Sequence, residues 1–251
     1  MKLVGCLIFV LALALPQVAA AAECVVLLHG LSRTGQSMKT MEVALKKASY
    51  KVVNAKYPST RKPVEELTPY VSTAVQKCGG DRVNFVTHSL GGIVLRAWLR
   101  DSRPANLGNV VMLAPPNQGS EVADKYAGSE LISIMGPAAE ELGTGPDSLP
   151  RRLGPANYTL GIIAGDRSAN PIFSSKLSGP NDGMLTVAST KLQGMRDHIT
   201  LHLTHTFIMN NPMTIAQTLT FLQKGRFDHG LDYNEATLMV KRIGKTEPRA
   251  Q

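Results

Sequence analysis

Short apolar runs that alternate with helical patterns constrain the fold of this chain most strongly. Three of the runs are Cys24–Leu28, Val83–Thr87 and Asn109–Leu113, and each is typical of a strand buried on both faces. Between them, apolar residues recur at helical spacing. Strands that alternate with helices need crossover connections, which favour a parallel arrangement. The sequence therefore predicts an α/β fold with a mainly parallel central sheet and helices on both of its faces.

The rest of the chain is less regular. We expect further strands over residues 50–54, 160–164 and 199–203, and a last helix over 212–224. Thr68 is expected to cap a helix that has Pro69 in its first turn. Residues 115–158 are rich in Pro, Gly and polar residues and predict a lid-like insertion over the top of the sheet. Residues 225–251 are polar and basic, and predict a loosely held tail. The domain would thus span 23–224.

The first 22 residues have the pattern of a signal peptide. Lys2 supplies a positive charge, Leu3–Leu15 is almost wholly apolar, and small residues follow Pro16. An uncleaved membrane anchor is the alternative, although the apolar run is shorter than the roughly 18 residues that suggest a membrane span. We therefore expect a periplasmic or secreted protein.

Two cysteines remain after such a cleavage, Cys24 and Cys78. An even number in an exported chain favours a disulfide. Cys24 opens a predicted strand and Cys78 closes the helix before the next strand, so both should lie at the amino edge of the parallel sheet. The alternative is a pair of free buried thiols.

The charge of the chain gives little support to a nucleic-acid partner. The formal net charge is +8, but only 5% of the residues are aromatic, and no basic stripe is interleaved with aromatic side chains. The positive charge is compatible with transient contact with an anionic membrane or cell-envelope surface. No nucleic acid is expected among the partners.

A candidate nucleophile lies between the strand at 83–87 and the helix that follows. The segment Thr87-His88-Ser89-Leu90-Gly91 is a variant of G-x-S-x-G with Thr in place of the first Gly. In that motif the serine occupies a strained turn, and small neighbours such as Gly91 relieve crowding. His88 should point away from the nucleophile. A capped helix start is the alternative interpretation.

The end of the first strand carries a second signal, His29-Gly30-Leu31. Gly30 would let the backbone approach a substrate closely. The N–H groups of Leu31 and Leu90 would then form an oxyanion hole, in which each donor is worth roughly 10²–10³ in rate. We expect His29 to shape this loop rather than to act as a base.

The candidates for base and acid follow the serine in the chain. His205 directly follows the last strand and is our candidate base, with His198 second. The acid should lie between serine and histidine. Asp182 is preferred, in a turn before an apolar run, and Asp166 is the second choice. Such an acid fixes the tautomer of the histidine and stabilises its protonated form.

Together these motifs resemble the bacterial secreted lipase and esterase branch of the α/β-hydrolase superfamily. The segment 114–120 strengthens the resemblance, because it is similar to the Pro-His-x-Gly-Ser/Thr segment of many lipases, with Asn117 in place of the histidine. The resemblance covers about residues 24–224. It implies the α/β-hydrolase fold and a Ser-His-Asp triad, and it is the main reason for preferring Asp182. We expect no metal and no cofactor.

These observations predict a serine hydrolase of the carboxylesterase or lipase type. It would act on a small-molecule or lipid ester through an acyl-enzyme intermediate. An acyltransferase or a thioesterase on the same fold is the alternative. A non-catalytic binding or folding-partner protein on the same scaffold is the alternative from a different class, and it would be expected to lack one of Ser89, Asp182 and His205.

Overall fold

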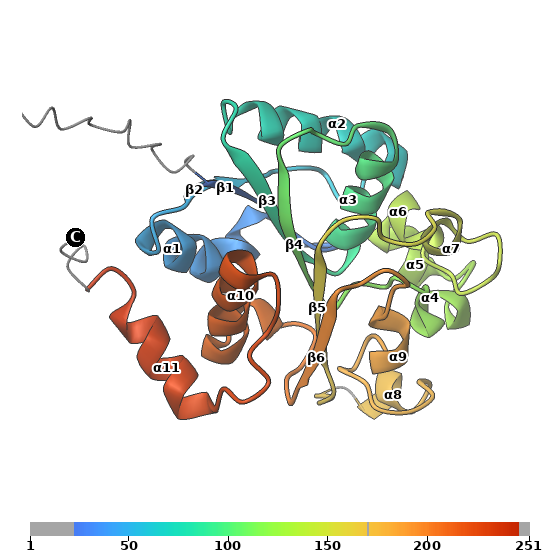
Figure 1. The fold of residues 1–251 in the computed structure, drawn as a ribbon. Coiled ribbons are helices and arrows are strands. Elements are labelled where there is room, and N and C mark those ends of the chain that lie inside the picture. Colours follow the sequence, from blue (N-terminus) through green and yellow to red (C-terminus); the bar gives the residue numbers. More distant parts are fainter. Residues whose placement is uncertain (1–22, 170, 246–251) are drawn as a thin grey trace, which may run out of the picture.

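The computed structural model describes residues 23–169 and 171–245 and contains a six-stranded sheet (Figure 1). The strands lie in the order β2-β1-β3-β4-β5-β6, and each neighbouring pair is parallel. They are β1 (Glu23–Leu28), β2 (Lys51–Asn54), β3 (Arg82–His88), β4 (Leu107–Leu113), β5 (Leu160–Gly165) and β6 (Asp197–Leu201). This confirms the predicted α/β class and the parallel sheet. The predicted signal peptide, residues 1–22, lies outside the described residues.

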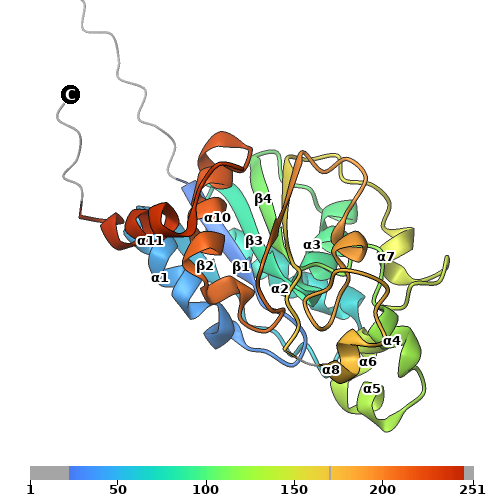
Figure 2. The ribbon, with the colours of Figure 1, turned by 90° about the horizontal axis from the view of Figure 1, so that it is seen from below.

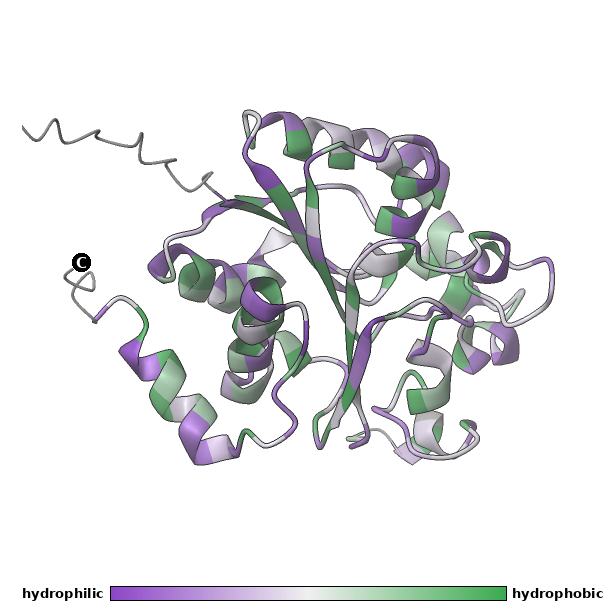
Figure 3. Ribbon diagram, in the orientation of Figure 1, coloured by the Kyte–Doolittle hydropathy of each residue, from purple (hydrophilic) through white to green (hydrophobic). Residues whose placement is uncertain are grey.

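Helices cover both faces of the sheet, as predicted. Val26 and Leu28 of β1 belong to one buried cluster, whereas Val25 and Leu27 belong to the other, because successive strand residues point to opposite faces. Figure 3 shows the resulting hydrophobic character of the central strands. On the first face lie α2 (Val64–Gln76) and α3 (Leu90–Asp101), and on the second lie α1 (Lys39–Lys47) and α10 (Pro212–Lys224). Short 3-10 turns precede α1 and α10 at Gly35–Met38 and Ile208–Asn210.

Helix α2 begins earlier than the sequence suggested. It starts at Val64, after Pro63, and Thr68 lies inside it instead of at its cap. The hydroxyl of Thr68 donates to the carbonyl of Glu65 at 2.8 Å. This is the carbonyl that Pro69 leaves without a partner, because proline has no N–H. Thr68 therefore compensates for the proline, which is how the helix continues through it.

The predicted insertion at 115–158 forms a group of short helices. These are α4 (Glu121–Lys125), α5 (Glu130–Met135), α6 (Pro137–Glu140) and α7 (Leu149–Arg152). Figure 2 shows α4, α5 and α6 together on one side of the molecule, next to α8 (Pro171–Ser174). A further short helix, α9 (Val187–Thr190), precedes β6.

A buried arginine fastens this insertion to the rest of the domain. Arg96 of α3 donates to the backbone carbonyls of Asn117, Pro150 and Gly154 at 2.8–3.1 Å. It also donates to the side-chain oxygen of Asn117. Burial lowers the pKa of Arg96 to about 10, so the guanidinium stays charged at neutral pH. The two ends of the insertion are therefore held by one side chain from the helix that follows Ser89.

The prediction of a loosely held tail after residue 224 is wrong for residues 225–245, which the structure describes. Residues Tyr233–Arg242 form α11, which packs against α10 (Figure 1). A capping box between Asp232 and Glu235 starts the helix. Ala236 is fully buried, and Met239, Val240 and Ile243 pack against the second core cluster. The helical spacing of these apolar residues is the signal that the polar composition obscured.

The sulfur atoms of Cys24 and Cys78 are bonded in the structure. This is the pairing expected from the sequence, and it joins the start of β1 to the end of the α2 segment. The two residues are 54 positions apart. In the chain-entropy model, a loop of that length stabilises the fold by about 4 kcal/mol.

Within residues 23–169 and 171–245, no helix combines the length and the apolar character needed to cross a bilayer.

Candidate active site

Ser89 lies in a strained turn between β3 and α3. Its backbone has φ 52° and ψ −124°, a combination that residues other than glycine rarely adopt. The N–H of Ser89 donates to the carbonyl of Leu113 at 2.9 Å, which fixes the turn against the end of β4. The carbonyl of Ser89 accepts from the N–H of Gly92 and so begins the helix. The turn leaves the serine partly exposed at the carboxyl edge of the sheet.

The glycines after Ser89 are required by close packing against other segments. A side chain at Gly91 would place its Cβ 2.6 Å from the carbonyl oxygen of Leu28, at the end of β1. The sequence had suggested crowding against the serine itself, but the closest obstacle is this neighbouring strand. At Gly92 a Cβ would meet Pro115, Met112 and the hydroxyl of Thr87. The larger Thr87 is therefore accommodated partly because Gly92 has no side chain.

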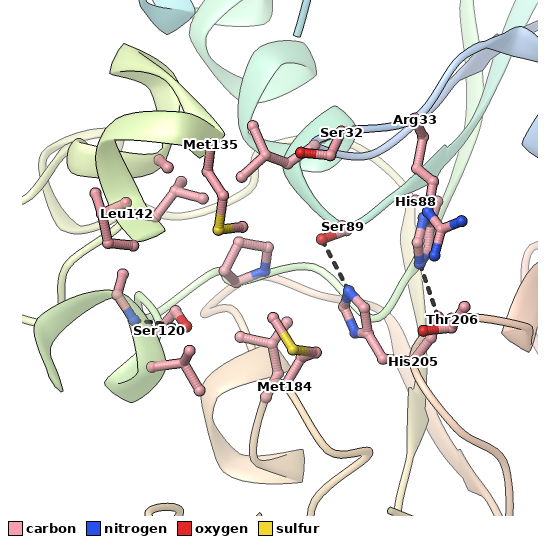
Figure 4. Close-up of a pocket in the computed structure, with 17 residues that line it drawn as sticks. Ser32, Arg33, His88, Ser89, Ser120, Met135, Leu142, Met184, His205 and Thr206 are labelled. Carbon is pink, nitrogen blue, oxygen red and sulfur yellow. Dashed lines mark hydrogen bonds between the residues drawn. The ribbon is translucent and has the colours of Figure 1, made fainter. Parts of the chain in front are cut away.

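Ser89, His205 and Asp182 form a continuous chain of hydrogen bonds. The distance from His205 Nε2 to Ser89 Oγ is 3.0 Å (Figure 4). The distance from His205 Nδ1 to Asp182 Oδ2 is 2.7 Å. The side chain of Asp182 is 1% exposed and that of His205 is 12% exposed. The fold thus brings together the three residues preferred from the sequence, although 116 positions separate Ser89 from His205.

Backbone groups hold Asp182 in one orientation. Its Oδ1 accepts from the N–H of Met184 at 3.0 Å and from that of Leu185 at 2.8 Å. Its own carbonyl accepts from the N–H of His205 at 3.0 Å. The carboxylate therefore presents Oδ2 to the imidazole while its other oxygen is already occupied.

Asp166, the second choice for the acid, and His198, the second choice for the base, have other partners. Asp166 Oδ1 is 3.0 Å from Nδ1 of His202, whose side chain is 77% exposed. This pair lies at the surface, where an ion pair contributes little. His198 Nε2 lies 3.1 Å from the hydroxyl of Thr190. The structure therefore brings Asp182, and not Asp166, to His205, and it gives His198 a different partner.

The loop after β1 lies directly against the serine turn. A Cβ on Gly30 would come within 2.9 Å of His88 Nδ1 and 3.1 Å of Ser89 Cβ, so only glycine permits this approach. Leu90 is the first residue of α3, and an N–H there has no partner within the helix. Within the described part of the chain, the N–H groups of Leu31 and Leu90 donate to no protein group. Both amides are available to an oxyanion.

His88 holds the backbone of His205 in place. Its Nε2 lies 3.0 Å from the carbonyl oxygen of His205. Because a carbonyl only accepts, Nε2 carries the hydrogen and Nδ1 has none in the neutral ring. The sequence indicated only that this ring points away from the nucleophile. The link to His205 was missed, and no local sequence signal could reveal a contact across 117 residues.

His29 belongs to the framework of the loop. Its Nδ1 donates to the carbonyl of Gly30 at 2.9 Å, and its ring stacks on Tyr57 with centroids 4.0 Å apart. The hydroxyl of Tyr57 in turn donates to the carbonyl of His29. His29 is fully buried. This geometry fits the shaping role expected from the sequence.

The serine opens into a cavity of about 370 Å³. Its walls come from the loop after β1, the serine turn, the insertion and the His205 loop, and they are mostly apolar. Figure 4 shows Met135 and Leu142 on one side of Ser89. In the described ranges, no cluster of three or more His, Cys, Asp or Glu side chains is arranged to hold a metal ion.

The sheet, the serine turn and its location at the carboxyl edge together define the α/β-hydrolase fold. Solved structures with this fold are similar to the chain over most of its length. The lipase BlEst2 of Bacillus licheniformis, in mature form, is 20% identical with a TM-score of 0.65, over 83% of this chain and 95% of that chain. The phospholipase PlaB of Legionella pneumophila, in complex with thio-NAD, is 19% identical with a TM-score of 0.67, over 89% of this chain and 62% of that chain. A metagenomic carboxyl esterase, MGS0156, is 19% identical with a TM-score of 0.58, over 90% of this chain and 76% of that chain.

The sequence comparisons add no family assignment. No protein-family model matches the chain, and no curated protein matches its sequence. At these levels of identity, the structural likeness establishes the fold.

The burial of three histidines makes the folded state sensitive to acid. It lowers the pKa of His88 well below 6.5 and also lowers the pKa values of His29 and His198. An unfolded chain protonates these rings below about pH 6.5, whereas the folded chain keeps them neutral to lower pH. The folded state is therefore destabilised progressively as the pH falls below about 6.5.

We accordingly expect the free energy of unfolding to decrease between pH 7.5 and pH 5.5. The slope reaches at most about 1.4 kcal/mol per pH unit for each such histidine. Urea unfolding at several pH values measures it, and His88→Gln should show a shallower slope. The lowered pKa values of Glu42 and Asp197 act in a more acidic window. A free energy of unfolding that is constant from pH 7.5 to 5.5 would contradict the interpretation.

A second prediction separates the two candidate acids. Asp182→Asn keeps the shape of the side chain but no longer stabilises the protonated His205, so turnover should drop by about 10²–10⁴-fold. Asp166→Asn is the matched control at the surface pair with His202. It should retain turnover and change the free energy of unfolding by at most about 1 kcal/mol. Ester hydrolysis and urea unfolding of both variants provide the test, and an inactive, stable Asp166→Asn would reverse the assignment.

Proposed function

We propose that the protein is a carboxylic ester hydrolase, an esterase or lipase, with Ser89 as its nucleophile. The observation that carries the proposal is the hydrogen-bond chain from Ser89 Oγ through His205 to the buried Asp182, at 3.0 Å and 2.7 Å. This chain opens into a mostly apolar cavity. A nucleophile, a base and a group that orients the base are the parts that acyl transfer needs.

The geometry supports a mechanism in two halves. Ser89 Oγ attacks the ester carbonyl while His205 Nε2 takes its proton, and Asp182 stabilises the imidazolium. The N–H groups of Leu31 and Leu90 would bind the oxyanion. His205 then returns the proton to the leaving alcohol, and an acyl-enzyme remains. Water, activated by the same histidine, releases the acid and restores Ser89.

The cavity favours an apolar acyl group. Its volume of about 370 Å³ lies within the roughly 300–1,000 Å³ that is typical of small-molecule sites. Ile132, Met135 and Leu142 from the insertion contribute to its lining. The names of the structural neighbours, a lipase, a phospholipase and a carboxyl esterase, support an ester substrate.

We further propose that the protein works outside the cytoplasm, in the periplasm or secreted. The Cys24–Cys78 disulfide supports this, because structural disulfides persist in oxidising compartments. The apolar segment that precedes residue 23 has the pattern of an export signal.

Hydrolysis of p-nitrophenyl esters of increasing acyl length tests the proposed function. We expect turnover by the purified protein, and a loss of at least about 10³-fold in Ser89→Ala. Ser102→Ala, which alters an exposed serine at the far end of α3 from Ser89, is the matched control for loss of a serine. If the wild-type protein hydrolyses none of the esters, or if Ser89→Ala retains most of the turnover, the proposal is wrong.

A further inference from the structure

The cavity at Ser89 has two chemically different ends. Met135 and Leu142 lie on one side of the serine in Figure 4, on the insertion. Arg33 and Thr206 lie on the other side, with His205. The first end is lined mostly by apolar side chains, with the hydroxyl of Ser120 among them, whereas the second end has a guanidinium group.

The proposed chemistry assigns a part of the substrate to each end. His205 Nε2 must reach the oxygen of the leaving alcohol in order to protonate it. The alcohol part of the ester would therefore lie on the His205 side of Ser89, where Arg33 is. The acyl chain would extend the other way, among the apolar side chains of the insertion. This assignment rests on the proposed function.

Arg33 is a cation without a protein partner in the described part of the chain. It makes no ion pair or side-chain hydrogen bond there, and its side chain is exposed. None of the 17 residues that line the cavity is acidic. Among the described residues that line the cavity, the guanidinium of Arg33 is thus the one permanent charge, and no lining side chain neutralises it.

Two further observations place this charge near the serine turn and near His88, whose ring is bonded to the backbone of His205. Arg33 follows Leu31 by two residues in the loop that packs against the serine turn. After burial and the neighbouring His205, the positive charge of Arg33 is among the causes that lower the pKa of His88. The chain as a whole carries a formal net charge of +8, which also attracts anionic molecules.

From this arrangement we propose that Arg33 is a specificity-determining residue that selects esters with an anionic group on the alcohol part. The group would be a carboxylate or a phosphate, which a guanidinium recognises through charge and paired N–H donors. Such a group could belong to a soluble ester or to the headgroup of a lipid. Arg33 would favour the binding of both.

The test compares two octanoyl esters that differ by one carboxylate. They are 4-nitro-3-(octanoyloxy)benzoate, which is anionic, and 2-nitrophenyl octanoate, which is neutral. The measured quantity is the ratio of kcat/KM for the anionic ester to kcat/KM for the neutral ester. A ratio within one preparation cancels the concentration of active protein, so partial misfolding of a variant does not affect it.

We expect this ratio to fall about three- to tenfold in Arg33→Gln. The fall is modest because the pair formed by Arg33 and the anionic group of the ester would be exposed to solvent, which weakens it. It should fall further in Arg33→Glu, whereas Arg33→Lys should keep most of it. Added salt should lower the wild-type ratio, because the Debye length is only about 8 Å at physiological ionic strength.

Arg226→Gln is the matched control. Arg226 is exposed and follows α10, whose last turn accepts hydrogen bonds from Asn109 near the start of β4. It therefore lies at the opposite edge of the sheet from Ser89, and its loss should leave the ratio unchanged. A similar fall in Arg226→Gln would show a general effect of net charge and overturn the proposal.

A lipid pair distinguishes the sources of the anion. Dioctanoyl phosphatidic acid and dioctanoylglycerol are compared in the same neutral detergent micelles. A dependence on Arg33 in the soluble pair supports recognition of a soluble anionic ester, and a dependence in the lipid pair alone supports a headgroup. If Arg33→Glu changes neither ratio while the neutral esters are hydrolysed, the inference is wrong and the proposed function stands. If no ester is hydrolysed, the proposed function itself fails.

Discussion

The close contact between the first turn of α3 and the end of β1 determines the geometry of the whole site. A Cβ at Gly91 would lie 2.6 Å from the carbonyl oxygen of Leu28, so the helix can take this position only with glycine there. That position sets the strained turn at Ser89. It also places the amides of Leu31 and Leu90 next to the same serine, with Gly30 permitting the loop to close. A side chain at Gly91 or at Gly30 would push the Ser89 turn away from the end of β1 and from the loop that follows it.

His205 is held by its backbone on both sides. Its N–H donates to the carbonyl of Asp182, and its carbonyl accepts from Nε2 of His88. These two bonds fix the loop between β6 and α10 without using the imidazole. The ring nitrogens remain available to Ser89 and to the side chain of Asp182. The imidazole of His205 is thus held in place by the fold itself, which would reduce the reorganisation that the proposed reaction requires.

The sequence predicted the features that depend on local patterns. Short apolar runs predicted the parallel sheet. The motif around Ser89 suggested the site, together with the order of Ser89, Asp182 and His205 in the chain. Features that depend on distant contacts were missed, such as the bond between His88 and His205 and the anchoring of the insertion by Arg96. Two local patterns were also misread. Thr68 compensates for Pro69 inside a helix, and the polar composition after residue 224 concealed the apolar spacing of α11.

The central claim is that Ser89 is a nucleophile activated by His205. Reaction with a fluorophosphonate, followed by peptide mass spectrometry, tests it most directly, because the probe bonds covalently to an activated serine. The account predicts one label per chain, on Ser89, and greatly slowed labelling in a folded His205→Ala variant. Labelling at another serine, or equally fast labelling of Ser89 without His205, would contradict it.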